Sequence, residues 1–171
     1  MIVRRTLAAF ALSLGLFTGL GACGDGDAEG DETRVTTQST ASGEKTDGNT
    51  VTLKAALNGA EEVPGPGANP GVGAASVEVS GTKVCPDLKV TMGEKPTGAH
   101  IHKGGKGASG PVVVDLKPEF TPGESAFTAK TCVDAPAETT TALIADPSGY
   151  YVNVHSATYP NGALRGQLAP L

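Results

Sequence analysis

The sequence predicts an all-β fold, an antiparallel, Greek-key-like β-sandwich or barrel of about eight or nine strands. Three observations support this prediction. Short β-like segments recur roughly every 8–15 residues after residue 50, and several alternate apolar with polar side chains, as half-buried strands do. Turn-forming residues separate them, because the chain contains 24 glycines and 12 prolines. Beyond the first two dozen residues, no long apolar stretch with the 3.6-residue period of a helix is present.

Residues 1–22 form a predicted export signal and are excluded from the fold. A basic start, MIVRR, precedes TLAAFALSLGLFTG, an apolar segment too short to favour a permanent membrane span. The segment ends in LGAC, residues 20–23, which resembles the lipobox of bacterial lipoproteins. That resemblance implies acylation of Cys23, which would anchor the protein in the cell membrane by its acyl chains, with the domain on the extracytoplasmic side. The alternative is an ordinary secretory signal with a chance cysteine.

Residues 23–49 are predicted to be a disordered acidic tether. Between residues 24 and 49 the chain has seven acidic and two basic side chains and almost no apolar ones, so it cannot bury enough surface to order itself. Residues 50–171 are expected to form one domain, with nine basic and eleven acidic side chains. No basic patch with interleaved aromatic residues is present, so nucleic acid is not an expected partner.

The predicted strands follow one another from residue 50 to the C-terminus. The first three have clearly alternating side chains, and a Pro/Gly loop over residues 61–71 separates the first from the second. The expected strands are TVTLKAAL (50–57), GAASVEVSG (73–81), DLKVTMG (87–93), AHIH (99–102), GPVVVDLK (110–117), SAFTAKTC (125–132), TTTALIAD (139–146), YYVNVHS (150–156) and ALRGQLA (163–169).

The cysteines suggest a disulfide bond. If Cys23 is acylated, Cys85 and Cys132 remain as an even pair in an exported protein, where disulfides form and persist. A bond between them would close a loop of roughly 48 residues and stabilise the fold by about 4 kcal/mol in the chain-entropy model. Two buried thiols are the alternative.

Three motifs in order resemble the CHRD domain, a module named after chordin. LNGAEEVPG (57–65) opens the pattern, AHIHKGGKGASGPVV (99–113) is its centre, and YYVNVHSATYPNGALRGQL (150–168) closes it. The resemblance spans residues 50–171 and implies an exported β-domain. It leads us to expect a non-catalytic binding or structural module, with no catalytic residues and with an unidentified protein or small-molecule partner.

The three histidines of the chain are the candidate ligands of a metal ion. His100 and His102 lie two residues apart on a predicted strand, so both point to one face while Ile101 points to the other. Neutral imidazoles suit copper or zinc, and His155 would complete a three-histidine site if its strand lies close. The favoured alternative is structural, with the histidines bracing the glycine-rich loop through Asn153 or backbone carbonyls.

A second, shorter resemblance is to the copper–zinc superoxide dismutase β-sandwich, which also has a His-x-His strand and a remote histidine. It implies a possible redox role, with Arg165 in the place of an anion-guiding arginine, although pairing of Arg165 with a carboxylate or carbonyls is favoured. The glycines after His102 lack the Gly-Lys-Ser/Thr ending of a phosphate-binding loop. Glu61 and Glu62 are adjacent on a predicted extended segment, so they should face opposite ways and form no acid/base pair.

Overall fold

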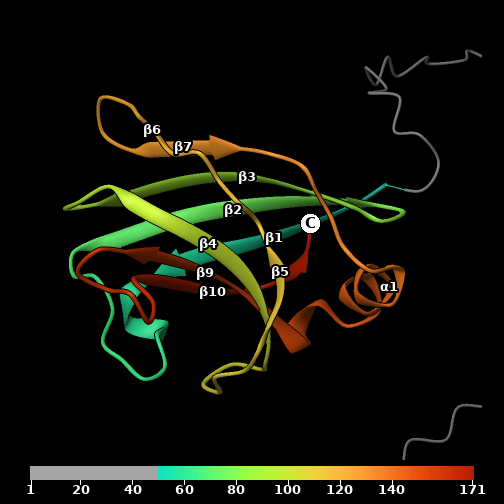
Figure 1. Cartoon of the computed structure of the whole chain (residues 1–171). Helices are drawn as coiled ribbons and strands as arrows, with labels where there is room; N and C mark the ends of the chain where they lie inside the picture. Colours follow the sequence, from blue (N-terminus) through green and yellow to red (C-terminus); the bar gives the residue numbers. More distant parts are fainter. Residues whose placement is uncertain (1–49) are drawn as a thin grey trace, which may run out of the picture. The chain divides into compact units, whose positions relative to one another are not determined.

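A computed structural model describes residues 50–171 of the chain (Figure 1). The predicted signal peptide of residues 1–22, the lipid attachment at Cys23 and the tether of residues 23–49 lie outside the described residues. Among residues 50–171, none of the helices has the length and apolar character that crossing a membrane requires.

Antiparallel strands dominate the described residues, which confirms the all-β prediction. The strands are β1 (Thr50–Asn58), β2 (Gly71–Ser80), β3 (Lys83–Met92), β4 (Pro96–Lys103), β5 (Val112–Asp115), β6 (Thr121–Pro122), β7 (Phe127–Lys130), β8 (Val133–Asp134), β9 (Tyr150–Ser156), β10 (Leu164–Gln167) and β11 (Ala169–Pro170). The helices are η1 (Gly59–Glu61), α1 (Ala137–Ala145) and η2 (Pro147–Gly149), of which η1 and η2 are single 3₁₀ turns.

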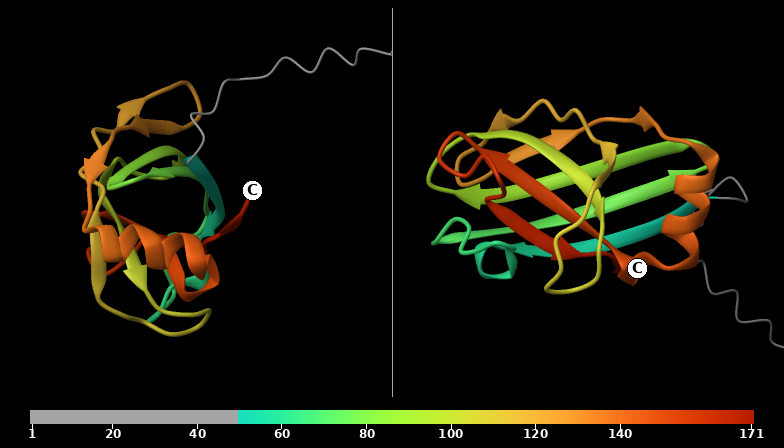
Figure 2. Two further views of the ribbon diagram at one scale, coloured as in Figure 1. Left: turned by 90° about the vertical axis from the view of Figure 1, so that its right-hand side faces the viewer. Right: turned by 60° about the horizontal axis from the view of Figure 1, so that its bottom comes forward.

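The strands form one sheet in the order β5-β4-β9-β10-β1-β2-β3-β7-β6, with β11 added to β1 and β8 added to β3. The sheet curls around a single core, so that its two halves face each other (Figure 2). Strands β1, β2 and β3 are neighbours in both sequence and space. Strands β9 and β10, in contrast, come from the C-terminal part of the chain and insert between β4 and β1.

The inner face of the sheet carries the hydrophobic core predicted from the alternating segments. Leu53 on β1, Val77 on β2 and Leu88 on β3 are each no more than 1 % exposed. Ile101 on β4 and Val152 on β9 are fully buried beside them in the same core. With few aromatic residues, the core depends on Val, Leu, Ile and Ala, and burial of each Val, Leu or Ile side chain contributes about 1.5–3 kcal/mol.

The strand predicted at residues 139–146 is wrong, because this segment belongs to helix α1. The segment contains three consecutive β-branched threonines, but Ala137 and Ala142 favour a helix, and Pro136 precedes the first helical residue with φ −54°. Thr140 and Leu143 lie one turn apart and are buried. The Thr140 hydroxyl donates to the Ala137 carbonyl, which satisfies it within the helix.

The predicted disulfide between Cys85 and Cys132 is confirmed. Cys85 lies on β3, and Cys132 lies between β7 and β8, which both pair with β3. The bond therefore fixes this β7–β8 segment to the strand that it already contacts.

Candidate functional site

The pairing of β4 with β9 brings the three histidines together. In this antiparallel pair, Gly98 is opposite His155 and His100 is opposite Asn153. Cross-strand neighbours point to the same face of a sheet, so His155 lies diagonally next to His100 on the outer face. His102 follows two residues later on that face, whereas Ile101 points into the core, as the alternation predicted.

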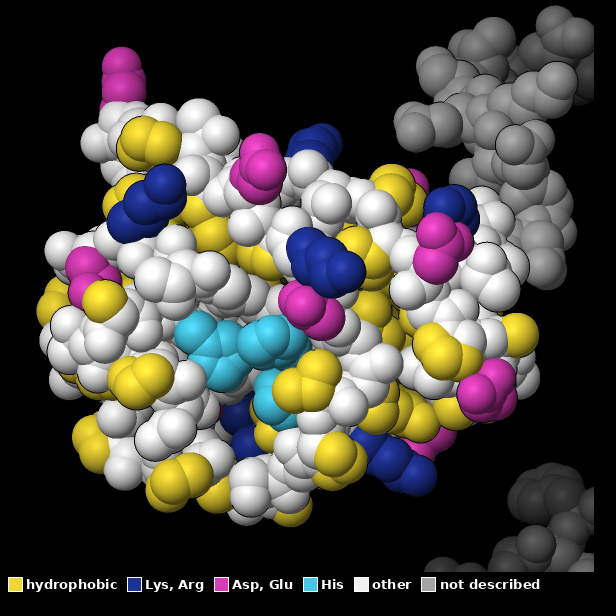
Figure 3. Space-filling view, in the orientation of Figure 1, with side chains coloured by type: hydrophobic (Ala, Val, Ile, Leu, Met, Phe, Trp, Pro, Cys, Tyr) yellow, Lys and Arg dark blue, Asp and Glu magenta, His cyan; other side chains and the backbone are white. Residues whose placement is uncertain are grey.

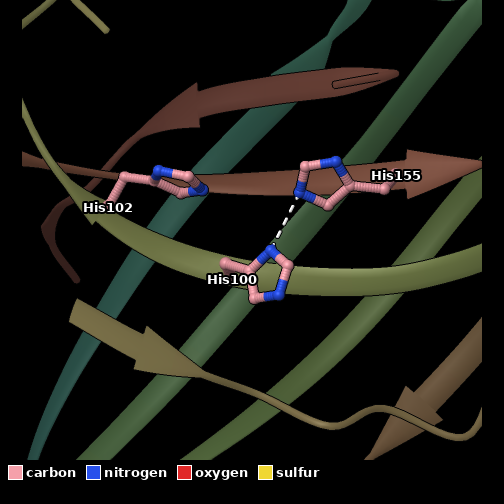
Figure 4. Close-up of side chains that lie close together, drawn as sticks. All are labelled: His100, His102 and His155. Atoms are coloured by element: carbon pink, nitrogen blue, oxygen red, sulfur yellow. Dashed lines mark hydrogen bonds between the residues drawn. The ribbon is translucent and has the colours of Figure 1, made fainter. Parts of the chain in front are cut away.

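The imidazole rings converge on one point (Figure 4). Nδ1 of His100 lies 2.9 Å from Nε2 of His155. One nitrogen from each of the three histidines can be chosen so that all three lie within 4.8 Å of one another. All three side chains are partly exposed, and they form one patch on the surface (Figure 3).

Backbone carbonyls fix the orientation of two of the rings. Nδ1 of His102 lies 2.9 Å from the carbonyl oxygen of Gly110, and Nδ1 of His155 lies 3.0 Å from that of Pro160. A carbonyl only accepts hydrogen bonds, so each Nδ1 donates its hydrogen and each Nε2 carries a lone pair. Among the described residues, Nε2 of His102 is buried and has no hydrogen-bond partner.

A carboxylate faces the third ring. Nε2 of His100 lies 3.7 Å from Oδ1 of Asp115 on the neighbouring strand β5. The backbone N–H of Lys117 donates to the same carboxylate oxygen, at 3.1 Å. Among residues 50–171, Lys117 is the non-glycine residue with positive φ, 44°, a conformation that costs free energy for an L side chain. The strained turn thus aims Asp115 at His100.

Burial affects the protonation of the histidines. It lowers the pKa of His102 and of His155 from the ordinary value, and the hydrogen bonds to Gly110 and Pro160 only partly oppose this shift. The proximity of His100 lowers both pKa values further. Both rings therefore favour the neutral form, which is the form that binds metal ions.

The glycine-rich loop is fastened to the outer face of the sheet by β10. Nη2 of Arg165, a residue only 1 % exposed, donates to the carbonyls of Gly105 and Ala108 at 2.9 and 2.8 Å. Nε2 of Gln167 donates to the carbonyl of Gly104 at 2.7 Å. The prediction that Arg165 pairs with carbonyls is confirmed, and its buried position does not suit an anion-guiding role.

Aromatic contacts connect Arg165 to the histidines. The Tyr151 ring stacks on His102 with centroids 4.9 Å apart and planes 10° apart. The Arg165 guanidinium lies 3.5 Å from the centre of the Tyr151 ring. The Tyr151 hydroxyl accepts the backbone N–H of Gly110, whose carbonyl holds His102. His102 is therefore held both by the loop and by the sheet.

A second buried polar contact connects the first and last motifs. Nδ2 of Asn153 donates to both carboxylate oxygens of Glu62, at 2.7 and 2.9 Å. Burial raises the pKa of Glu62 to about 7, although Asn153 and the charge of Arg165 act in the opposite direction. The sequence left Asn153 or backbone carbonyls as partners of the histidines. The partners are the carbonyls of Gly110 and Pro160, since Nδ2 of Asn153 donates to Glu62.

The two adjacent glutamates face different partners, as predicted. Glu61 forms an ion pair with Lys106 at 3.0 Å, while Glu62 is buried against Asn153. Glu61 lies in the 3₁₀ turn η1 rather than on an extended segment. Sequence reasoning missed Asp115 and the contact of Glu62 with Asn153, since nothing in the local pattern of either acidic residue indicates a distant partner.

These features define a curled antiparallel β-domain with a histidine cluster on its outer face. Loops within the central and final sequence motifs hold two of the histidines. The family model described as the CHRD domain matches residues 53–168. The chain therefore belongs to the CHRD family, as the three motifs predicted. Neither the curated proteins nor the solved structures contain a significant match to it.

Proposed function

We propose that this protein is a membrane-anchored extracytoplasmic lipoprotein whose CHRD domain binds one copper or zinc ion, without catalysis, through His100, His102 and His155. The observation that carries the proposal is the convergence of three imidazole nitrogens within 4.8 Å of one another. The lipobox-like LGAC sequence at residues 20–23 supports the anchoring part.

The spacing of the nitrogens is close to that needed by an ion. A tetrahedral ion with metal–nitrogen bonds of about 2.0–2.1 Å separates its ligand nitrogens by roughly 3.3 Å. The closest pair, His100 and His155, is already at 2.9 Å, and the largest separation of the three nitrogens is below 4.8 Å. The largest separation must therefore shorten by up to about 1.5 Å when an ion binds.

The surroundings of the rings support metal binding over a purely structural role. Each ring has an oxygen atom facing the nitrogen that is not at the point of convergence: the carbonyls of Gly110 and Pro160, and the carboxylate of Asp115. This is the arrangement by which proteins orient metal-binding histidines. A structural histidine would in addition satisfy its second nitrogen, and a buried unpaired one costs about 1–3 kcal/mol. Nε2 of His102 has no such partner among residues 50–171.

Calorimetric titration with copper(II) and zinc(II) tests the proposal on the mature chain, with Cys23→Ser preventing acylation. We expect one ion per chain, with binding weakened more than about 100-fold in His102→Gln and in His100→Gln. Lys89→Gln, a change at an exposed position on β3, is the control and should bind as the parent does. Circular dichroism of the metal-free variants establishes that they are folded. Absence of binding at micromolar protein, or equal binding by folded histidine variants, would overturn the proposal.

A further inference from the structure

We infer that a slot between strands β5 and β8 binds an extended segment of another protein as an added β-strand, one in which basic residues alternate with small apolar ones. The slot is a cavity of about 470 Å³, bordered by residues 113–117 on one side and by residues 132–136 on the other. In strand addition, backbone hydrogen bonds supply the affinity and alternate side chains supply the specificity. This inference does not depend on the proposed metal ion.

Both walls of the slot are free edges of the sheet. Among residues 50–171, β5 pairs with β4 and β8 pairs with β3, and no strand joins β5 to β8. Because the sheet curls, the two edges border one cavity instead of lying far apart (Figure 2). A free edge presents backbone N–H and carbonyl groups that can pair with another chain.

The backbone groups of Asp115 point into the slot. The N–H of the next residue, Leu116, donates to the Ala99 carbonyl on β4 at 3.1 Å. Hydrogen-bonded and non-hydrogen-bonded pairs alternate along an antiparallel ladder, so Asp115, opposite His100, belongs to a non-hydrogen-bonded pair. Its N–H and its carbonyl therefore face away from β4, toward the slot.

The opposite wall has the same pattern. The Ala135 N–H donates to the carbonyl of Thr82, the residue before β3, at 2.9 Å. By the same alternation, Asp134, opposite Lys83, turns its N–H and carbonyl away from β3. Asp115 and Asp134 thus give each wall a backbone donor and acceptor. An extended chain can pair with both walls, because its own backbone groups point alternately to its two sides.

The side chains at the slot define the sequence that fits. Val114 and Ala135 face the core and are only 4 % and 6 % exposed, whereas Asp115 and Asp134 are exposed on the outer face. Figure 3 shows hydrophobic side chains in a hollow to the right of the histidines. An added strand would place alternate side chains over Val114 and Ala135, where little room remains, so these side chains must be small and apolar. The others would lie on the outer face between the two carboxylates.

The charges at the slot favour basic side chains on that outer face. Asp115, Asp134 and Lys117 are the charged residues that border the cavity, which leaves an excess of one negative charge. Asp134 also pairs with Lys83 at 2.8 Å, but both side chains are more than half exposed, so this ion pair is weak. A lysine or arginine opposite Asp115 would complement the two carboxylates.

A fluorescein-labelled heptapeptide of alternating lysine and valine, titrated with the metal-free mature chain carrying Cys23→Ser, tests the inference by fluorescence anisotropy. We expect saturable binding at one site per chain. The same peptide with N-methylated valines should bind about tenfold more weakly or worse, because it lacks N–H groups that pair with a sheet edge. The two peptides have equal charge, so general attraction to an acidic domain would not distinguish them.

Two changes at one position test the slot itself. Asp134→Pro should abolish binding, because proline removes an N–H that faces the slot and forms no bond to β3. Asp134→Asn should weaken binding about threefold to fivefold through the lost charge. Asp87→Asn, which removes the carboxylate of the Lys130–Asp87 ion pair outside the slot, is the matched control and should bind as the parent does. Circular dichroism establishes that the variants are folded.

The outcomes decide the inference separately from the metal site. Absence of saturable binding, equal affinity for the two peptides, or unchanged affinity in folded Asp134→Pro would overturn it. If Asp134→Pro does not fold, the comparison of the two peptides still decides. A parent chain that sediments as a dimer, and a dimer that Asp134→Asn weakens, would mean that a second copy occupies the slot, and a foreign segment would be wrong. His102→Gln should bind the peptide as the parent does.

Discussion

Nδ1 of His100 lies 2.9 Å from Nε2 of His155, although 55 residues separate them in the chain. Nε2 of His155 is the acceptor in this contact, because Nδ1 of His155 carries the ring hydrogen and donates it in a hydrogen bond to the Pro160 carbonyl. Without an ion, His100 thus donates to His155. If an ion were bound, both nitrogens would be its ligands, and the hydrogen of neutral His100 would move to Nε2, which faces the Asp115 carboxylate.

Gly110→Ala should weaken metal binding and lower stability. A Cβ atom at residue 110 would collide with the carbonyl oxygen of Lys103, so the loop that holds His102 must shift. We expect a loss of about 1–3 kcal/mol in the free energy of unfolding, together with weaker copper binding. Gly105→Ala is the control, because nothing lies within 4 Å of a Cβ there. Denaturant unfolding and calorimetry measure both effects, and equal behaviour of the two variants would contradict the prediction.

Asp115→Asn should reduce copper and zinc affinity by about 10–100-fold, because the carboxylate that orients His100 loses its charge. The metal-free protein should keep its stability to within about 0.5 kcal/mol, since Asp115 is exposed. Asp87→Asn, on β3 and far from the cluster in sheet order, should leave metal affinity unaltered. An affinity unchanged in Asp115→Asn would show that the 3.7 Å approach to His100 has no role in binding.

Glu62 should make the fold less stable as the pH rises. Burial raises the pKa of Glu62 from 4.5 to about 7, so the native state holds its proton more tightly than the unfolded chain. Its stabilising contribution is complete below pH 4.5 and is lost through pH 7, a change of about 3 kcal/mol. The positive charge of Arg165 lowers the pKa of Glu62 and so opposes the effect of burial in part.

Glu62→Gln tests this pH dependence. Unfolding free energies measured between pH 4 and 8 should show a smaller decline in the variant than in the parent, since an amide does not titrate. Glu78→Gln, at an exposed position on β2, should retain the parent's decline. A decline of the same size in Glu62→Gln would rule out this carboxyl group as its source.

Removal of the disulfide by the double change Cys85→Ser, Cys132→Ser should cost about 4 kcal/mol, because the bond closes a loop with a sequence separation of 47 residues. Denaturant unfolding of the two proteins measures the difference. The parent, with Cys23→Ser, should show no free thiol until it is reduced. A thiol titre before reduction would contradict a stable bond.

Cys23→Ala should release the protein from the membrane fraction, because the proposed acyl chains supply the anchor. Cell fractionation and labelling with a radioactive fatty acid measure the effect. Thr37→Ala, a change within residues 23–49, should leave both the fractionation and the label unaltered. Membrane association that persists in Cys23→Ala would mean that another part of the protein binds the membrane.

The sequence alone determined the local geometry of this domain. Side chains alternate between the two faces along any extended strand. Ile101 therefore had to point to the face opposite that of His100 and His102, and the apolar side chains within each of β1 to β3 had to share a face. The motif order was also sufficient to identify the family.

Only the tertiary structure decided which segments meet. The pairing of β4 with β9 and the contact of Glu62 with Asn153, 91 residues apart, depend on burial of the whole core, which no local pattern encodes. The same holds for α1, where burial of Thr140 and Leu143 accompanies helix formation despite the β-branched sequence. The histidines were visible in the sequence, but their convergence required the sheet order.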